Sequence, residues 1–212
     1  MTEKNFTGIE LIPETVPATT LYILLHGVGA NPSNLLPLAN ILKLAFPNAA
    51  FLLPQGTFPF DGGGSGRQWF SIKEVSEENR ITRVAEAMPT LHALVKHAQE
   101  RFHVSHADTT LIGFSQGAIM ALEFSIAHDG CAGRVLAFSG RFSTLPEKAP
   151  EHTKLHILHG ENDPVISVGY AQAAFKRITE LNGDITIDTA ASTGHEINAE
   201  LADHAVHRLQ TS

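Results

Sequence analysis

Short apolar segments alternate with longer helical patterns along this 212-residue chain, and no other feature of the sequence constrains the fold as strongly. Several of the short segments consist almost wholly of β-branched residues and leucine, which is typical of strands covered on both faces. The alternation predicts an α/β fold in which a mostly parallel central sheet of about seven strands carries helices on both faces. We predict strands at residues 9–12, 20–25, 50–53, 109–114, 134–138, 154–158 and 185–189.

Helical patterns occupy the intervals between these strands. Ser76 is expected to cap the longest helix, which extends to about residue 102 and has a kink at Pro89. Residues 116–128 are apolar nearly all round, so this helix should be buried on the sheet. The first strand is a candidate for an antiparallel position at an edge. The other helices are predicted at residues 33–46, from 167 to shortly before 183, and from about 197 to 209.

The composition is that of an ordinary globular protein, with 43% hydrophobic and 17% charged residues. Since no linker rich in glycine and proline divides the chain, we expect a single domain over residues 1–212. The net charge of −7 gives no electrostatic reason to bind nucleic acid or an anionic membrane surface. These observations leave the oligomeric state open, as a monomer or a homodimer.

Cysteine usage and the first residues bear on the compartment. Cys131 is the only cysteine, so no intramolecular disulfide can form. Residues 1–14 lack the apolar core of a signal peptide, and no apolar run reaches the roughly 18 residues of a membrane-spanning helix. We therefore expect a cytoplasmic protein with no stable membrane insertion.

The motif Gly113-Phe114-Ser115-Gln116-Gly117 joins a predicted strand directly to a predicted helix. This arrangement is typical of a nucleophile elbow, in which a strained turn raises a serine to the carboxyl end of a sheet. The two glycines leave room for the backbone to approach its neighbours closely. The alternative is a serine that only caps the helix. We expect Ser115 to be a nucleophile.

A serine hydroxyl needs a base at neutral pH, and in this fold class the acid and the histidine follow the serine along the chain. His195 is the candidate base, because it lies in a loop between the last predicted strand and the last predicted helix. Asp163 is the candidate acid, in a loop after the preceding strand. We prefer it to Glu161, because the following Pro164 suggests a rigid re-entry of the chain that fixes its position.

An oxyanion needs two fixed hydrogen-bond donors. The backbone N–H of Gln116, at the start of a helix, is one candidate. The second is the N–H of Val28 in the turn Leu25-His26-Gly27-Val28-Gly29, where glycines stand on both sides of the valine. The chain has no nucleotide-binding glycine motif, and we expect neither a cofactor nor a metal.

Residues 54–75 form a long interval that contains five glycines. A loop of this length in a compact domain is usually functional or disordered. We expect it to be mobile and to form one wall of an open acyl groove, with Trp69 and Phe70 contacting the substrate. The alternative is a disordered surface loop with Trp69 packed into the core. The 13 residues between Gly140 and Lys154 are too few for a helical lid domain.

Taken in order, these motifs resemble the phospholipase/carboxylesterase family of the α/β-hydrolase fold, which includes acyl-protein thioesterases and small bacterial carboxylesterases. The resemblance extends along the whole chain and also covers Pro54-Gln55-Gly56, Ser139-Gly140 and Gly194-His195-Glu196. It implies a catalytic triad and an oxyanion hole. The triad residues would be Ser115, Asp163 and His195, and the oxyanion donors the N–H groups of Val28 and Gln116.

Two departures from the family pattern lie near the substrate side. Ser71 follows Trp69-Phe70 where the family usually has aspartate, and Val28 and Ala30 replace leucine and aspartate in the turn after the second strand. They bear on chain length and leaving group and leave the chemistry unchanged. The chain looks more like the bacterial esterase branch than the protein-depalmitoylating branch.

We therefore expect a serine carboxylesterase that hydrolyses short- to medium-chain acyl esters of small molecules through an acyl-enzyme. One alternative is an acyl-protein thioesterase or lysophospholipase that uses the same three residues. A ligand-binding protein with the hydrolase fold is a further alternative, since a fold does not determine a function.

Overall fold

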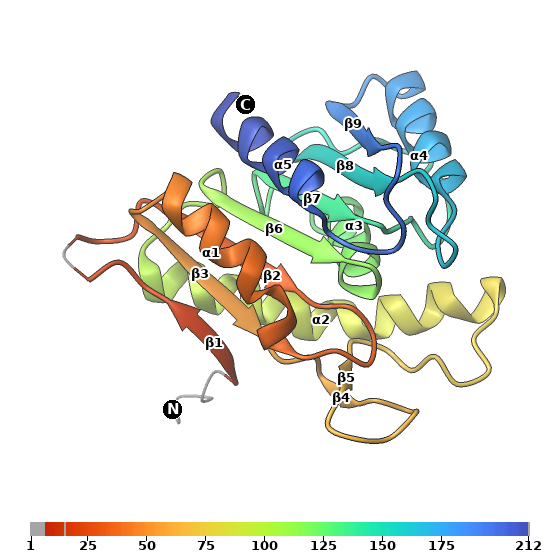
Figure 1. The fold of residues 1–212 in the computed structure, drawn as a ribbon, viewed down its shortest axis with the longest axis horizontal. Coiled ribbons are helices and arrows are strands. Elements are labelled where there is room, and N and C mark those ends of the chain that lie inside the picture. The colour runs from red at the N-terminus through yellow and green to blue at the C-terminus, as the bar shows by residue number, and fades with distance from the viewer. Residues whose placement is uncertain (1–6, 15, 212) are drawn as a thin grey trace.

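The computed structural model describes residues 7–14 and 16–211. Among them, seven strands form one sheet in the order β1-β3-β2-β6-β7-β8-β9 (Figure 1). All neighbours are parallel except β1, which pairs antiparallel with β3 and confirms the expected edge position. The strands are β1 (Gly8–Leu11), β2 (Thr20–Leu25), β3 (Ala49–Pro54), β6 (Thr109–Phe114), β7 (Arg134–Phe138), β8 (Lys154–Gly160) and β9 (Ile185–Ala190).

Helices cover both faces of this sheet, as the alternating pattern predicts (Figure 1). The core on one face is made with α1 and α5, and the core on the other with α2, α3 and α4. The predicted α/β architecture is therefore confirmed. The helices are α1 (Leu36–Ala45), α2 (Glu77–Phe102), α3 (Gln116–Ala127), α4 (Val168–Glu180) and α5 (Ala199–Thr211), and a 3₁₀ helix, η1 (Pro32–Leu35), precedes α1.

The signals at helix ends act locally as expected. The Ser76 hydroxyl accepts from the N–H of Asn79, and the Asn79 side chain accepts from the N–H of Ser76, so α2 begins with a reciprocal cap. Pro89 lies inside α2, which continues through it. In α3 the residues around the whole helix are buried, because β6, β7 and α2 pack around it. These contacts hold the start of α3 in a fixed place relative to the sheet.

The glycine-containing interval between β3 and α2 is more ordered than predicted. It contains a small antiparallel hairpin, β4 (Phe58–Pro59) and β5 (Arg67–Gln68). The Arg67 guanidinium closes it by donating to the carbonyl oxygens of Gly56 and Thr57, at 3.0 and 2.9 Å. This segment therefore has its own hydrogen-bonded structure instead of forming an open loop.

Asp61, in the same interval, places a carboxylate next to Ser71, the position at which the family pattern has aspartate and this chain has serine. It accepts hydrogen bonds from the Ser71 hydroxyl at 2.7 Å and from the N–H groups of Ile72 and Lys73. The bonds from Ser71 and Gln68, together with these N–H groups, lower the pKa of Asp61 to about 2. The serine found at position 71 thus binds an aspartate from elsewhere in the segment.

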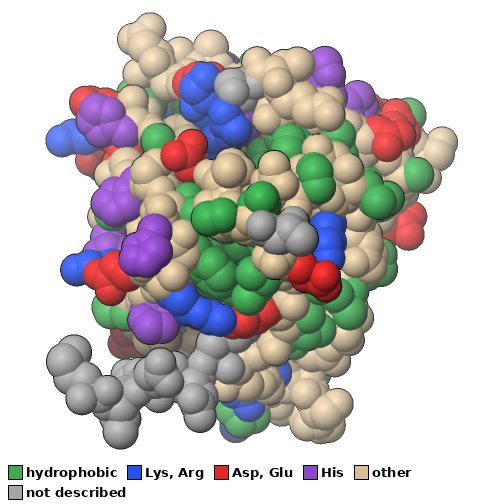
Figure 2. All heavy atoms as spheres, turned by 90° about the vertical axis from the view of Figure 1, so that its left-hand side faces the viewer, with side chains coloured by type: hydrophobic (Ala, Val, Ile, Leu, Met, Phe, Trp, Pro, Cys, Tyr) green, Lys and Arg blue, Asp and Glu red, His purple; other side chains and the backbone are tan. Residues whose placement is uncertain are grey.

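Figure 2 shows the side of the molecule that lies at the left of Figure 1, where strands such as β6 begin. Apolar side chains gather at the centre of this face, with histidine and charged side chains around them. None of the helices in the described residues has the length and apolar character needed to span a membrane. The candidate site lies at the other end of the strands, where β6 and β8 end.

Candidate active site

Ser115 occupies the turn between β6 and α3. Its backbone has φ 53° and ψ −115°, a strained conformation for a residue other than glycine. A Cβ at Gly113 would collide with the carbonyl oxygen of Gly117, and a Cβ at Gly117 with that of Leu25. Glycine is therefore required at both positions for the turn to pack against β2 and α3. The Ser115 side chain reaches the surface only slightly, with 7% of the residue exposed.

His195 lies between Ser115 and Asp163 and contacts both. Its Nδ1 is 2.7 Å from Oδ2 of Asp163, and its Nε2 is 2.9 Å from Oγ of Ser115. Because Nδ1 faces a carboxylate, this nitrogen carries the ring proton, and Nε2 is free to accept from the serine hydroxyl. The structure therefore brings together the three side chains that the sequence analysis selected.

The loop after β8 fixes the Asp163 carboxylate. Its Oδ1 accepts from the N–H groups of Val165 and Ile166, at 2.8 and 2.9 Å, and its Oδ2 faces His195. Burial alone would raise the pKa of Asp163. The hydrogen bonds from His195 and the two N–H groups outweigh burial, so this pKa is lower than usual. Asp163 therefore stays ionised at neutral pH.

His159, at the end of β8, lies behind Asp163 and is fully buried. Its Nε2 is 2.7 Å from the carbonyl oxygen of Ile166 and 3.4 Å from Oδ2 of Asp163, so Nε2 carries the ring proton. Burial is the main cause that lowers the pKa of His159. A neutral histidine thus supports the loop that holds the carboxylate.

Glu161, the other candidate acid, is exposed and accepts from the Thr189 hydroxyl at 2.8 Å. It points to β9 and away from His195, whose carboxylate partner is Asp163. The geometry therefore favours Asp163 over Glu161.

Val28 lies in the turn between β2 and η1, and this turn is fixed from two sides. The N–H of Gly29 donates to the carbonyl of Arg67, and the N–H of Arg67 donates to Ala30, both at 2.8 Å. The N–H of Gly56 donates to Nε2 of His26 at 3.0 Å. His26 Nδ1 must then carry the proton and donate to the carbonyl of Gly27, at 2.7 Å.

Burial lowers the pKa of His26, and the neutral ring can therefore keep both hydrogen bonds near neutral pH. In the part of the chain that the structure describes, the N–H groups of Val28 and Gln116 donate to no other group. Neither donor is thus committed to another group among the described residues.

The contact of Trp69 and Phe70 with substrate stays a prediction. The two residues are 3% and 4% exposed and belong to the core, which agrees with the alternative that packs Trp69 into the core. The reason is a set of buried hydrogen bonds to the two turns. The Gln116 side chain accepts from the N–H of Trp69 and donates to the carbonyl of Phe70, and the indole N–H of Trp69 donates to the carbonyl of His26, each at 2.8 Å.

A groove of about 470 Å³ lies beside His195. Leu38 and Ile41 of α1 contribute to one wall, and Ile197 and Ala202 to the opposite one. Trp69 and Phe70 are absent from the described residues that line it. The sequence contains no signal for this groove, because apolar residues on amphipathic helices have the same pattern whether they face a core or a groove.

Sequence comparisons place the chain among hydrolases. A family model described as phospholipase/carboxylesterase matches residues 7–212. Esterase YpfH of Escherichia coli strain K12 is 41% identical over 194 residues, which cover 92% of this chain and 83% of the relative. Acyl-protein thioesterase 1 of Saccharomyces cerevisiae is 28% identical over 178 residues, covering 76% of this chain and 78% of that protein.

Solved structures agree with the sequence relatives. The crystal structure of esterase PE8 matches with a TM-score of 0.89 and 27% identity, over 97% of this chain and 98% of that one. The Bacillus cereus carboxylesterase matches with a TM-score of 0.81 and 18% identity, over 98% and 95% of the two chains, and supports the fold alone. The chain belongs to the phospholipase/carboxylesterase family, as an ester hydrolase with the α/β-hydrolase fold.

Proposed function

We propose that this protein is a serine carboxylesterase that hydrolyses short- to medium-chain acyl esters, with Ser115, His195 and Asp163 as its catalytic triad. The observation that carries the proposal is the position of His195, whose two ring nitrogens face the serine hydroxyl and the carboxylate at 2.9 and 2.7 Å. These contacts favour the tautomer of His195 that carries its proton on Nδ1, and in this tautomer Nε2 can accept the serine proton.

In the acylation step, Ser115 Oγ attacks the ester carbonyl carbon while His195 Nε2 takes the hydroxyl proton. The carbonyl oxygen becomes an oxyanion, which accepts from the N–H groups of Val28 and Gln116. Asp163 stays ionised and stabilises the imidazolium. When the intermediate collapses, the bond to the ester oxygen breaks, and His195 returns its proton to that oxygen as the alcohol leaves.

In the deacylation step, water takes the place of the alcohol. His195 removes a proton from the water, the resulting nucleophile attacks the acyl-serine, and the acid is released as Ser115 regains its proton. The chain thus supplies every proton-transfer group that the two half-reactions use.

The proposed preference for short and medium acyl chains rests on the absence, among the described residues, of a helical lid over Ser115. β7 ends at Phe138 and β8 begins at Lys154, and this interval contains no helix that could cover Ser115. Each methylene contributes about 0.8 kcal/mol only when it is fully buried, so an uncovered site gains little from a long chain. The names of the relatives, esterase and acyl-protein thioesterase, support an acyl substrate and make a thioester the second candidate.

A matched panel of substrates tests this proposal. kcat/KM is measured for p-nitrophenyl esters from acetyl to palmitoyl and for acyl thioesters of the same chain lengths. We expect turnover of the esters, with a maximum at short or medium chains. A steady rise to palmitoyl, or a higher kcat/KM for thioesters throughout, would favour the thioesterase alternative.

A further inference from the structure

The groove beside His195 begins at the reacting groups. The rings of Phe114 and His195 line its inner end, with their centroids 5.0 Å apart. Gly27 also lines it, and a Cβ on Gly27 would lie only 3.4 Å from the Cβ of Ser115. The groove therefore starts within one side chain of the nucleophile and continues outward between α1 and the start of α5.

The direction of proton transfer decides which part of an ester this groove can receive. The ester oxygen that leaves must accept its proton from His195 Nε2, so this oxygen lies on the His195 side of the reacting carbon. The oxyanion lies on the side of the two backbone N–H donors. A groove lined by His195 and by the residues that follow it in sequence thus opens next to the position of the leaving oxygen.

We propose that this groove is the leaving-group subsite and binds the neutral, apolar alcohol portion of the ester. The proposal rests on the proposed function and specifies its substrate. The walls facing the groove are largely apolar, with Leu38 and Ile41 on one side and Ile197 and Ala202 on the other. Burial of an alkyl chain between them strengthens binding by roughly two- to fourfold per methylene.

Charge further restricts the alcohol. Glu196 lines the groove and is exposed, and the described lining residues include no lysine or arginine. A phosphate-bearing alcohol, such as the one a lysophospholipase releases, would meet a carboxylate and no cationic partner. The groove therefore disfavours phosphorylated alcohols, and its apolar walls favour uncharged alkyl groups.

A pair of substitutions on α1 tests the assignment. Ile41 lines the groove and is 39% exposed, whereas Leu44 lies one turn further along α1, is 86% exposed and is outside the groove. Ile41→Trp narrows the groove, and Leu44→Trp is the matched control. kcat/KM is measured for ethyl, butyl and hexyl acetate, and for p-nitrophenyl esters that vary only in the acyl chain.

We expect Ile41→Trp to lower kcat/KM for hexyl acetate about tenfold relative to ethyl acetate, with the acyl-chain profile unchanged. All three acetates give the same acetyl-enzyme, so its hydrolysis rate should be the same in wild type and variant. Leu44→Trp should leave both profiles unchanged. A changed acyl profile, or a changed acetyl-enzyme hydrolysis rate, would assign the groove to the acyl chain and overturn the proposal, as would unchanged profiles in Ile41→Trp.

Ala199→Trp repeats the test from the opposite wall, because Ala199 is exposed at the start of α5 and also lines the groove. Circular dichroism checks that each variant is folded. If Ile41→Trp does not fold, the alcohol and acyl profiles of Ala199→Trp test the groove assignment instead. Turnover of p-nitrophenyl acetate by wild type and by Ser115→Ala is measured independently. Absence of turnover in wild type, or equal turnover in Ser115→Ala, would refute the proposed function, whereas Ser115-dependent turnover with unchanged alcohol profiles would refute only the groove assignment.

Discussion

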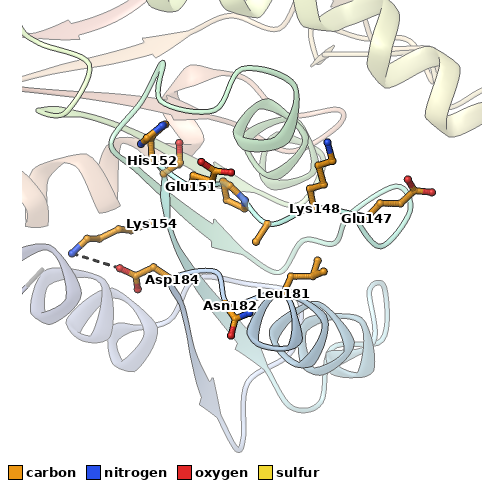
Figure 3. Close-up of a pocket in the computed structure, with 11 residues that line it drawn as sticks. Glu147, Lys148, Glu151, His152, Lys154, Leu181, Asn182 and Asp184 are labelled. Atoms are coloured by element: carbon orange, nitrogen blue, oxygen red, sulfur yellow. Dashed lines mark ion pairs between the residues drawn. The ribbon is translucent and has the colours of Figure 1, made fainter.

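Two hollows of nearly equal size lie on this molecule, and they differ in what surrounds them. The groove beside His195 has a volume of about 470 Å³, and a second pocket has about 460 Å³. The second pocket lies where β8 and β9 begin, and two of the residues that line it, Lys154 and Asp184, form an ion pair at 3.6 Å at one side (Figure 3). The groove lies at the opposite end of β8.

The two pockets differ in the loops around them, because in the described part of the chain only the loops beside the groove hold reactive side chains in contact with one another. At the carboxyl ends of β6, β8 and β9, the loops converge and hold a serine, a carboxylate and an imidazole in hydrogen-bond contact. The second pocket has several charged side chains, such as Glu147, Lys148 and Glu151, that extend from its surface (Figure 3). Charges exposed in this way are screened by water and are ill suited to catalysis.

The largest expected effect comes from removing the nucleophile. Ser115→Ala should lower kcat for a p-nitrophenyl ester by about 10⁴- to 10⁶-fold, because the three residues act as a unit. The unfolding curve of the variant, compared with wild type, shows whether the fold is retained. Near-normal turnover by a folded Ser115→Ala protein would show that Ser115 is not the nucleophile and that the groove beside His195 is not the reactive site.

The next largest effect concerns the acid. Asp163→Asn should lower kcat by about 10⁴-fold, because an amide at this position favours the wrong tautomer of His195. Glu161→Gln is the matched control two residues away and should retain wild-type kcat. The reverse result, with an active Asp163→Asn and an inactive Glu161→Gln, would identify Glu161 as the acid.

The third prediction concerns His156, which lies in β8 between the two hollows. Burial, followed by the charges of Arg208 and Arg134, lowers its pKa from 6.5 to about 4. The folded protein thus keeps His156 neutral at pH values where the unfolded chain protonates it. The free energy of unfolding should therefore fall as the pH drops from about 6.5 to 4, by on the order of 3 kcal/mol from this residue.

Urea unfolding of wild type and His156→Gln at several pH values between 7.5 and 4.5 measures this contribution. The glutamine variant should have a shallower dependence on pH, since the buried carboxylates common to both proteins contribute equally. Parallel curves for the two proteins would show that His156 is not the group responsible.

A smaller effect is expected from Trp69, which supports the turn instead of binding substrate. Trp69→Phe removes the indole N–H and leaves the buried carbonyl of His26 without this donor. We expect kcat to fall about tenfold with little change in KM, because the turn that carries Val28 is loosened. A rise in KM at constant kcat would instead support the predicted contact between Trp69 and substrate.

The smallest effect is expected at the second pocket. The side chains of Lys154 and Asp184 are 46% and 59% exposed, so their ion pair contributes little. Asp184→Asn should change kcat/KM by less than about twofold and the free energy of unfolding by less than about 1 kcal/mol. A large loss of activity would show that the two ends of β8 are functionally coupled.

Local patterns were sufficient to predict the elbow. The bounds of β2, β6 and β7 agree with the prediction, because each strand is a short segment that is mostly apolar after one or two polar residues at its start. Ser115 follows directly, since the motif, the strand and the helix are contiguous in sequence. The order of the acid and the base along the chain then identified Asp163 and His195.

The position of Trp69 could not be predicted in this way. It depends on hydrogen bonds to His26 and Gln116, which lie 43 and 47 residues away along the chain. No local periodicity encodes such contacts. The hairpin of β4 and β5 escaped prediction for the same reason, since each strand has only two residues and Arg67 closes it.

Covalent labelling of the nucleophile tests the central claim most directly. Wild type and Ser115→Ala are treated with a fluorophosphonate, which reacts with activated serines, and the modified peptide is identified by mass spectrometry. We predict one adduct, on Ser115, in wild type and none in Ser115→Ala. An adduct on another residue, labelling that persists in Ser115→Ala, or no labelling of wild type would contradict the account.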